Sequence, residues 1–244
     1  MATSAKSSSS APASSAASRW SFRALLLAAF IGLCSYLNSI NLTPQSRFYL
    51  LTPSSLHASV LTSLSAASAA GASGNASVII DTLITQLVAD HPQMSFATDY
   101  KNKREWVFNN AGGAMGSMFI LHASITEYLI IFGSAVGTEG HSGRHTADDY
   151  FHILTGRQTA YEAGDLTREI YNPGDVHHMK RGVVKQYAME PESWALEYAA
   201  GWIPLMLPFG FADSMFSTLD VQTLYHTVRI TAREMIKNLL IGKI

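Results

Sequence analysis

Titratable side chains are concentrated in one apolar stretch, residues 122–156, and these are the first candidates for chemistry. Six of the nine histidines lie between His122 and His178, in a chain of which only 14% of residues are charged. A carboxyl group held among apolar neighbours is pushed toward its neutral, protonated form. A general acid needs that form. The stretch therefore predicts a site that exchanges protons in dry surroundings.

Three carboxylic acids are the main candidates for the proton donor. Glu197 lies in the segment WALEYAAGWIP, where strand alternation would place it on one face with its alanine neighbours. Asp148 and Asp149 follow the GHSGRH turn, and adjacent residues of a strand point to opposite faces, so at most one of them can enter a barrel. Two carboxyl groups forced together can share a proton. The alternatives are an exposed strand position for the glutamate and a turn or helix cap for the aspartates.

The histidines raise a metal-site alternative. His141, His145, Asp149 and His152 are spaced four and three residues apart and would share a helical face. The chain has no HExxH motif, however, and the glycines around His141 argue against a helix there. We expect no bound metal and no cofactor.

Bulk composition limits the function classes. The 244-residue chain has a formal net charge of -1, which gives no basic footprint for nucleic acid. Its single cysteine, Cys34, excludes an intrachain disulfide. Hydrophobic residues make up 48% of the chain, which points to membrane contact or an unusually apolar interior.

The N-terminal part predicts a tail and a membrane anchor. Residues 1–20 are mostly serine and alanine and predict a disordered tail. Residues 21–46 predict a single transmembrane helix, with a signal peptide and a buried helix as alternatives. Arg19 and Arg23 precede the apolar core, which favours a cytoplasmic N-terminus. Asn41 and Asn75 begin formal glycosylation sequons.

Three further regions must position the candidate residues. Residues 47–104 predict a helical region with a small-residue linker. Residues 105–200 contain short apolar runs separated by glycine-rich turns, which predicts an antiparallel barrel or sandwich. Residues 201–244 predict C-terminal helices, the last of them basic and amphipathic. Such a helix can lie in a membrane surface or pack against its own domain.

Three strings in combination resemble a known family. HAS-x-x-EY, GHSGR and EY-x-x-G-x-IP are similar to those of the fungal sterol Δ8→Δ7 isomerases and the related sigma non-opioid receptor, over roughly residues 78–237. HTADDYF is more similar to the enzyme. The resemblance implies a mainly β, cupin-like barrel with an N-terminal transmembrane helix and two C-terminal membrane-associated helices. It also implies a homotrimer in the endoplasmic reticulum membrane.

The resemblance also implies roles for individual residues. The receptor's essential ligand-binding glutamate falls on Glu197, and its pocket tyrosine and phenylalanine fall on Tyr128 and Phe132. Phe151 occupies the position of the receptor's second pocket acid, and the nearby acid conserved in type falls on Asp148. Two pocket tryptophans of the receptor are replaced, by Ala114 and Met189.

The implied reaction moves a sterol double bond by adding one proton and removing another. We expect Glu197, sharing a proton with Asp148 or Asp149, to protonate C9 and leave a cation at C8. His122, Glu127 or His145 would take the C7 proton or hold the sterol hydroxyl group. Aromatic rings would stabilise the cation, and lipophilic amines would inhibit by imitating it. The expected catalytic residues are Glu197, Asp148, Asp149, His122 and Glu127; the expected substrate-binding residues are Tyr128, Phe132, His145, Phe151, Trp194 and Tyr198.

Two other functions remain open at this point. One is a non-catalytic, receptor-like membrane protein that binds lipophilic amines or sterols. The other is a soluble, metal-dependent cupin enzyme. The HTADDYF string and the missing pocket tryptophans favour the sterol isomerase.

Overall fold

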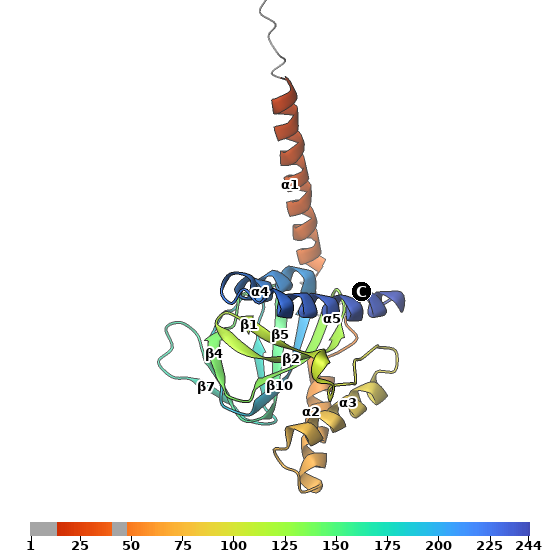
Figure 1. Cartoon of the computed structure of the whole chain (residues 1–244), viewed down its shortest axis with the longest axis vertical. Coiled ribbons are helices and arrows are strands. Elements are labelled where there is room, and N and C mark those ends of the chain that lie inside the picture. Colours follow the sequence, from red (N-terminus) through yellow and green to blue (C-terminus); the bar gives the residue numbers. More distant parts are fainter. Residues whose placement is uncertain (1–13, 41–47) are drawn as a thin grey trace, which may run out of the picture. The chain divides into compact units, whose positions relative to one another are not determined.

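The computed structural model describes residues 14–40 and 48–244, and the chain divides into two compact units, residues 1–44 and 45–244. The described part of the first unit is one helix, α1 (Ser14–Ile40) (Figure 1). It begins earlier than predicted, because residues 14–20, which we expected in the tail, form its first turns. They are mainly alanine and serine, and alanine has the highest helix propensity. The rest of the predicted tail, the end of the predicted span and the Asn41 sequon lie outside the described residues.

The helical part of the predicted membrane anchor is confirmed over residues 21–40, but the span itself is not. None of the helices in residues 14–40 and 48–244 combines the length and the apolar character that crossing a membrane requires. The continuous apolar core of α1, from Ala24 to Leu37, is shorter than the roughly 20 residues of a typical span.

Two helices form a hairpin at the start of the second unit. Helix α2 (Pro53–Ala69) begins with a capping box between Thr52 and Ser55. Helix α3 (Ala76–Asp90) begins with the Asn75 side chain accepting hydrogen bonds from the next turn's amides. The two helices pack against each other through buried apolar residues such as Val60 and Leu83.

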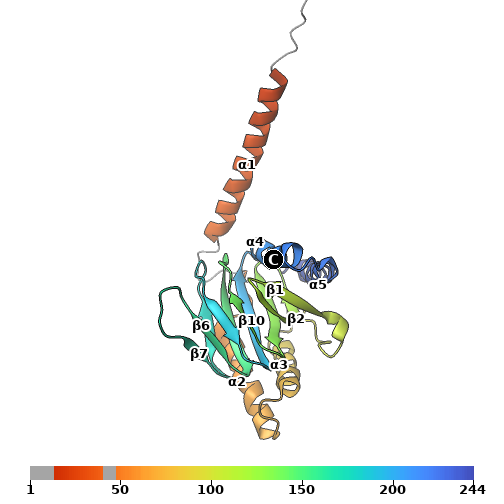
Figure 2. The same cartoon turned by 60° about the vertical axis from the view of Figure 1, so that its left-hand side comes forward.

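The strands form two antiparallel sheets, which confirms the mainly β prediction (Figure 2). A 3-10 turn, η1 (Lys103–Glu105), leads into the first strand. The six-stranded sheet has the order β1 (Trp106–Ala111), β2 (Ala114–Ala123), β3 (Glu127–Ser134), β10 (Ser193–Gly201), β5 (Ala147–Thr155) and β8 (Val176–Met179). The four-stranded sheet has the order β4 (Thr138–His141), β9 (Gln186–Met189), β6 (Gln158–Tyr161) and β7 (Glu169–Tyr171).

The central strands of the six-stranded sheet are buried on both faces. Along β3, Leu129 and Ile131 pack with residues of α2 and α3 in one core. Tyr128, Ile130 and Phe132 belong to a second core inside the barrel. Because successive side chains of a strand point to opposite faces, neighbours in the sequence enter different cores. This alternation decides which candidate residues can reach a common site.

Helices α4 (Ile203–Phe216) and α5 (Val221–Leu240) lie across one end of the barrel (Figure 1). The Asp220 side chain caps α5 by accepting a hydrogen bond from the Thr223 amide at 2.9 Å. Ile230 is buried in the inner core, whereas Tyr225 and Ile236 are exposed. Helix α5 therefore packs on its own unit and still presents apolar side chains outward.

Candidate active site

A pair of carboxyl groups lies at the centre of the barrel. Glu197 of β10 and Asp149 of β5 come from neighbouring strands, in which Ala199 is directly opposite Asp149. Both residues line the same internal cavity, and a hydrogen bond joins their carboxyl groups. A carboxylate only accepts hydrogen bonds, so this contact requires one of the two groups to carry a proton.

Burial holds both carboxyl groups toward their protonated forms. It raises the pKa of Asp149 to about 7 and raises the pKa of Glu197 well above its ordinary value. Negative charge on Asp149 raises the pKa of Glu197 further. No ion pair joins either group to a basic side chain within the described residues. The pair therefore retains a shared proton at neutral pH, with Glu197 as its donor.

The cavity around this pair is mostly aromatic and aliphatic. Its walls include the rings of Tyr128, Phe132, Phe151 and Tyr187, from β3, β5 and β9. The hydroxyl groups of Tyr128 and Thr231 lie 3.1 Å apart, which fixes the position of the tyrosine ring under α5. Ring faces attract cations. The cavity thus combines a proton donor with surroundings that favour positive charge.

His145 lines the same cavity as a neutral imidazole. Its Nε2 atom donates a hydrogen bond to the carbonyl oxygen of Ser142 at 2.7 Å, which leaves Nδ1 as the ring's acceptor. Burial lowers the pKa of His145. The ring packs edge-on against Phe209 of α4, with 5.2 Å between the centroids. A neutral imidazole with a free acceptor nitrogen can take up a proton.

Five other predicted site residues do not line this cavity. Asp148 points to the opposite face of β5, where its Oδ1 atom lies 3.2 Å from His178 Nε2. His122 is fully buried beside the Ser95 carbonyl oxygen. Trp194 packs against Trp106, outside the inner core.

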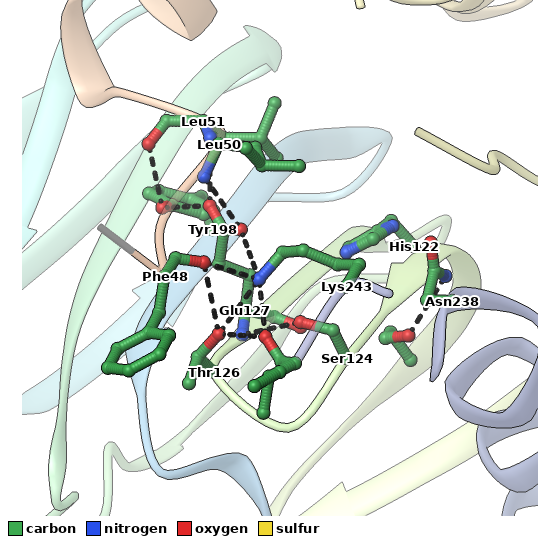
Figure 3. Close-up of polar contacts among 12 residues, drawn as sticks. Phe48, Leu50, Leu51, His122, Ser124, Thr126, Glu127, Tyr198, Asn238 and Lys243 are labelled. Carbon is green, nitrogen blue, oxygen red and sulfur yellow. Dashed lines mark hydrogen bonds and ion pairs between the residues drawn. The ribbon is translucent and has the colours of Figure 1, made fainter. Parts of the chain in front are cut away.

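Tyr198 and Glu127 belong instead to a buried polar cluster on the other side of the sheet (Figure 3). The two oxygens of Glu127 accept hydrogen bonds from the amides of Leu50 and Leu51, at 3.0 and 2.9 Å. Tyr198 donates its hydroxyl proton to Glu127 at 2.8 Å, and Lys243 Nζ forms an ion pair with Glu127 at 2.9 Å. Glu127 therefore connects the start of the unit, the barrel and the C-terminal end.

Several cavity residues were not among the predicted site residues. Tyr187 and Asn109 lie on strands, so the alternation of side chains along a strand could have placed them on the inner face. Asn109, for example, shares a face of β1 with the buried Val107. Phe209 and Thr227 lie on α4 and α5. Their positions depend on how the helices dock, and no sequence pattern within a helix specifies that.

The structure divides the four residues of the predicted metal set. His141, His145 and Asp149 line the cavity, whereas His152 faces His57 on the other side of β5, with 6.0 Å between the rings. Across residues 14–40 and 48–244, no group of three or more histidine, cysteine, aspartate or glutamate side chains is arranged to hold a metal ion.

A family model described as "ERG2 and Sigma1 receptor like protein" matches residues 24–243, so the chain belongs to this family. The C-8 sterol isomerase of Mycosarcoma maydis is 51% identical over 222 residues, covering 90% of each chain. That of Aspergillus fumigatus is 50% identical, covering 91% of this chain and 87% of its own. The sigma non-opioid intracellular receptor 1 of Xenopus tropicalis is 40% identical, covering 65% of this chain and 71% of its own.

Two solved structures overlap part of the chain. KdgF from Halomonas sp. is 14% identical with a TM-score of 0.34, covering 43% of this chain and 93% of its own. A predicted oxalate decarboxylase from Thermotoga maritima is 15% identical with a TM-score of 0.33, covering 41% and 96%. The description of the two-sheet barrel rests on the strand pairing of this chain and not on these similarities.

Proposed function

We propose that the protein is a C-8 sterol isomerase that moves a ring double bond from the 8,9 to the 7,8 position. The observation that carries the proposal is the hydrogen-bonded Glu197–Asp149 pair facing an apolar, aromatic cavity. An isolated alkene is a poor base, so its protonation requires an acid kept protonated at neutral pH. The high identity to the named isomerases, over nine tenths of the chain, supports the same activity.

In the proposed mechanism Glu197 donates its proton to C9. The electrons of the 8,9 double bond form the new C9–H bond and leave a cation at C8. The negative charge left on the carboxyl pair stabilises this cation, because preorganised charge acts strongly where water is excluded. The rings of Tyr128 and Phe132 add cation–π attraction.

Removal of the C7 proton completes the reaction. The electrons of the C7–H bond then form the 7,8 double bond and neutralise the cation at C8. Of the three predicted bases, His145 lines the cavity and is neutral, whereas His122 and Glu127 lie outside it. We assign the proton removal to Nδ1 of His145. Exchange with solvent would then return a proton to Glu197.

Entry of a sterol requires the cavity to widen. Its free volume is about 100 Å³, whereas pockets for ligands of this size hold roughly 300–1,000 Å³. Helix α4 is the wall best suited to move, because Pro208 inside it cannot donate a backbone hydrogen bond. We propose that the sterol enters beside α4.

The finer assignments also belong to this proposal. The family resemblance supports a cupin-like barrel, a homotrimer and residence in the endoplasmic reticulum membrane. Helix α1 would act as the single-pass anchor, and the exposed apolar side chains of α5 would contact the membrane surface. Resistance of the full-length protein to extraction by alkaline carbonate would support the anchor, and complete release would contradict it.

The test of function is conversion of a Δ8-sterol by the purified, detergent-solubilised protein in deuterated water. The isomerase proposal expects a Δ7-sterol that carries one deuterium. The receptor-like alternative expects no product from folded protein that nevertheless binds a lipophilic amine tightly. The greater identity to the isomerases than to the receptor favours the enzyme.

Asp149→Asn is expected to lower kcat/KM by about 10²-fold, by analogy with the loss of one preorganised electrostatic group. It should also move the alkaline limb of the pH profile to lower pH. Negative charge on Asp149 raises the pKa of Glu197, so removing that charge lowers it. Glu197 then loses its proton at a lower pH, and activity falls there as the pH rises. The measurement is kcat/KM as a function of pH.

Asp148→Asn is the matched control, because it makes the same chemical change at the adjacent residue. Asp148 faces away from the cavity and contacts His178 and the Arg181 amide. Its pH profile should change much less than that of Asp149→Asn, because the charge of Asp148 is the smallest of the influences on the pKa of Asp149. Equal effects of the two substitutions would argue against the assignment of Asp149.

A further inference from the structure

A second hollow, separate from the carboxyl pair, lies between α5 and the start of the barrel. It has a volume of about 630 Å³, and we call it the basic groove. Its defining residues are Lys103, Arg104, Trp106, Tyr225, His226 and Arg229, from η1, β1 and α5. The groove adjoins the catalytic cavity, because Phe108 lines both.

The charged side chains that line the groove are all basic. Lys103, Arg104 and Arg229 contribute positive charge, and none of the lining residues is acidic. None of the three forms an ion pair with another residue of the described chain. The next basic residues along the same side of α5 do form ion pairs. Arg233 pairs with Glu105 at 2.6 Å, and Lys237 pairs with Glu234 at 3.0 Å.

The rim of the groove is apolar and exposed. Phe108 is 55% exposed and Tyr225 is 63% exposed, and the adjoining Val221 and Val228 of α5 are exposed as well. A soluble anion would gain nothing from these side chains. A phospholipid would place its acyl chains along them and its phosphate among the cations.

A polar atom without a partner lies in the wall of the groove. His226 is partly buried, and its Nδ1 atom is buried with no hydrogen-bond partner among the described residues. When it carries a proton, this atom can donate to a phosphate oxygen. Arginine recognises phosphate through its planar fork of donors.

We propose that the basic groove binds the headgroup of an anionic phospholipid. The bound lipid would hold the β1–α5 edge of the barrel against the membrane, beside the cavity that shares Phe108. A cluster of basic side chains attracts anionic lipids, so the groove should prefer an anionic phospholipid to one without net charge. This proposal does not depend on the isomerase activity, so its test can fail while the proposed function stands.

The test compares lipid retention by two double variants of the full-length, detergent-solubilised protein in native mass spectrometry. Arg104→Gln/Arg229→Gln removes two charges from the groove. Arg168→Gln/Lys180→Gln removes two charges from exposed positions elsewhere in the barrel. The added lipids are phosphatidylserine and phosphatidylcholine, and size-exclusion profiles confirm that all proteins are folded.

We expect the wild type and the Arg168/Lys180 variant to retain phosphatidylserine in preference to phosphatidylcholine. Each cation beside an anionic headgroup contributes about fivefold in affinity, so the groove variant should bind phosphatidylserine roughly 25-fold more weakly. Equal retention of the two lipids by the wild type, or equal losses in the two variants, would overturn the proposal. Displacement of the lipid by inorganic phosphate at matching concentrations would also overturn it, because a free anion would then be the ligand.

Discussion

Glu197→Gln is expected to abolish sterol isomerisation while leaving the fold intact. The amide has nearly the shape of the carboxyl group but cannot donate a proton to an alkene. Loss of a positioned general acid costs typically 10²–10⁴-fold in rate. The measurement is conversion of a Δ8-sterol in deuterated water, with the product followed by mass and the variant assayed beside the wild type. The wild type should incorporate deuterium into a Δ7-sterol, and the variant should form no detectable product.

Glu190→Gln provides a control for the change of glutamate to glutamine. Glu190 pairs with Arg157 at the protein surface, 3.3 Å away, and does not line the cavity. Its activity should equal that of the wild type. The assembly state of both variants should be unchanged, because neither substitution alters side-chain volume. Normal turnover by Glu197→Gln would remove Glu197 from the acid role.

Strand alternation explains most of what the sequence could predict about the site. Once Glu197 is placed inside the barrel, Trp194 and Tyr198 must lie on the opposite face of β10, as the structure shows. The same rule separates Asp149 from Asp148 and Tyr128 from Glu127. The prediction named residues from both faces of these strands. A motif consists of consecutive residues, so similarity to a motif does not tell which face each residue occupies.

The positions of other residues depend on strand register and on contacts between distant parts of the chain, which a local sequence pattern does not specify. His122 follows an irregularity in the pairing of β2 with β3, where the register shifts after Ile120. A shift of one residue changes which face a side chain occupies. The partner of Glu127 is Lys243, which is 116 positions away, so only the docking of the C-terminal end brings the two together. The mainly β fold, by contrast, followed from runs of apolar residues and their turns.

The start of the chain shows the limits of composition as a guide. Serine and alanine in residues 14–20 predicted a tail, yet these residues continue the helix that the apolar core establishes. Helix propagation is easier than helix nucleation, so a formed helix extends into neighbouring alanine-rich sequence. The apolar content of the predicted span indicated a helix, which is confirmed over residues 21–40. Its membrane role remains a prediction.

Lys243→Met is expected to cause the largest loss of stability of the substitutions considered, about 3 kcal/mol. Lys243 and Glu127 are both almost fully buried, at 6% and 0% exposure. Removing one partner of a buried ion pair costs about 3–5 kcal/mol, because the other charge is left uncompensated. The hydrogen bonds that Glu127 accepts from Leu50, Leu51 and Tyr198 place the loss at the lower end of this range. The measurement is the free energy of unfolding in urea. Lys180→Met, at an exposed position, should change it little.

A double-mutant cycle then separates a structural role of this pair from a catalytic one. Glu127→Gln/Lys243→Met removes both charges, so it should be less destabilising than the sum of the two single substitutions. Because the pair lies across the sheet from the cavity, the folded fraction of each variant should keep the kcat of the wild type. A large fall in kcat with little loss of stability would instead return Glu127 to the catalytic site. Geometry argues against that outcome, because the ring and hydroxyl group of Tyr198 lie with Glu127 on the outer face of the sheet.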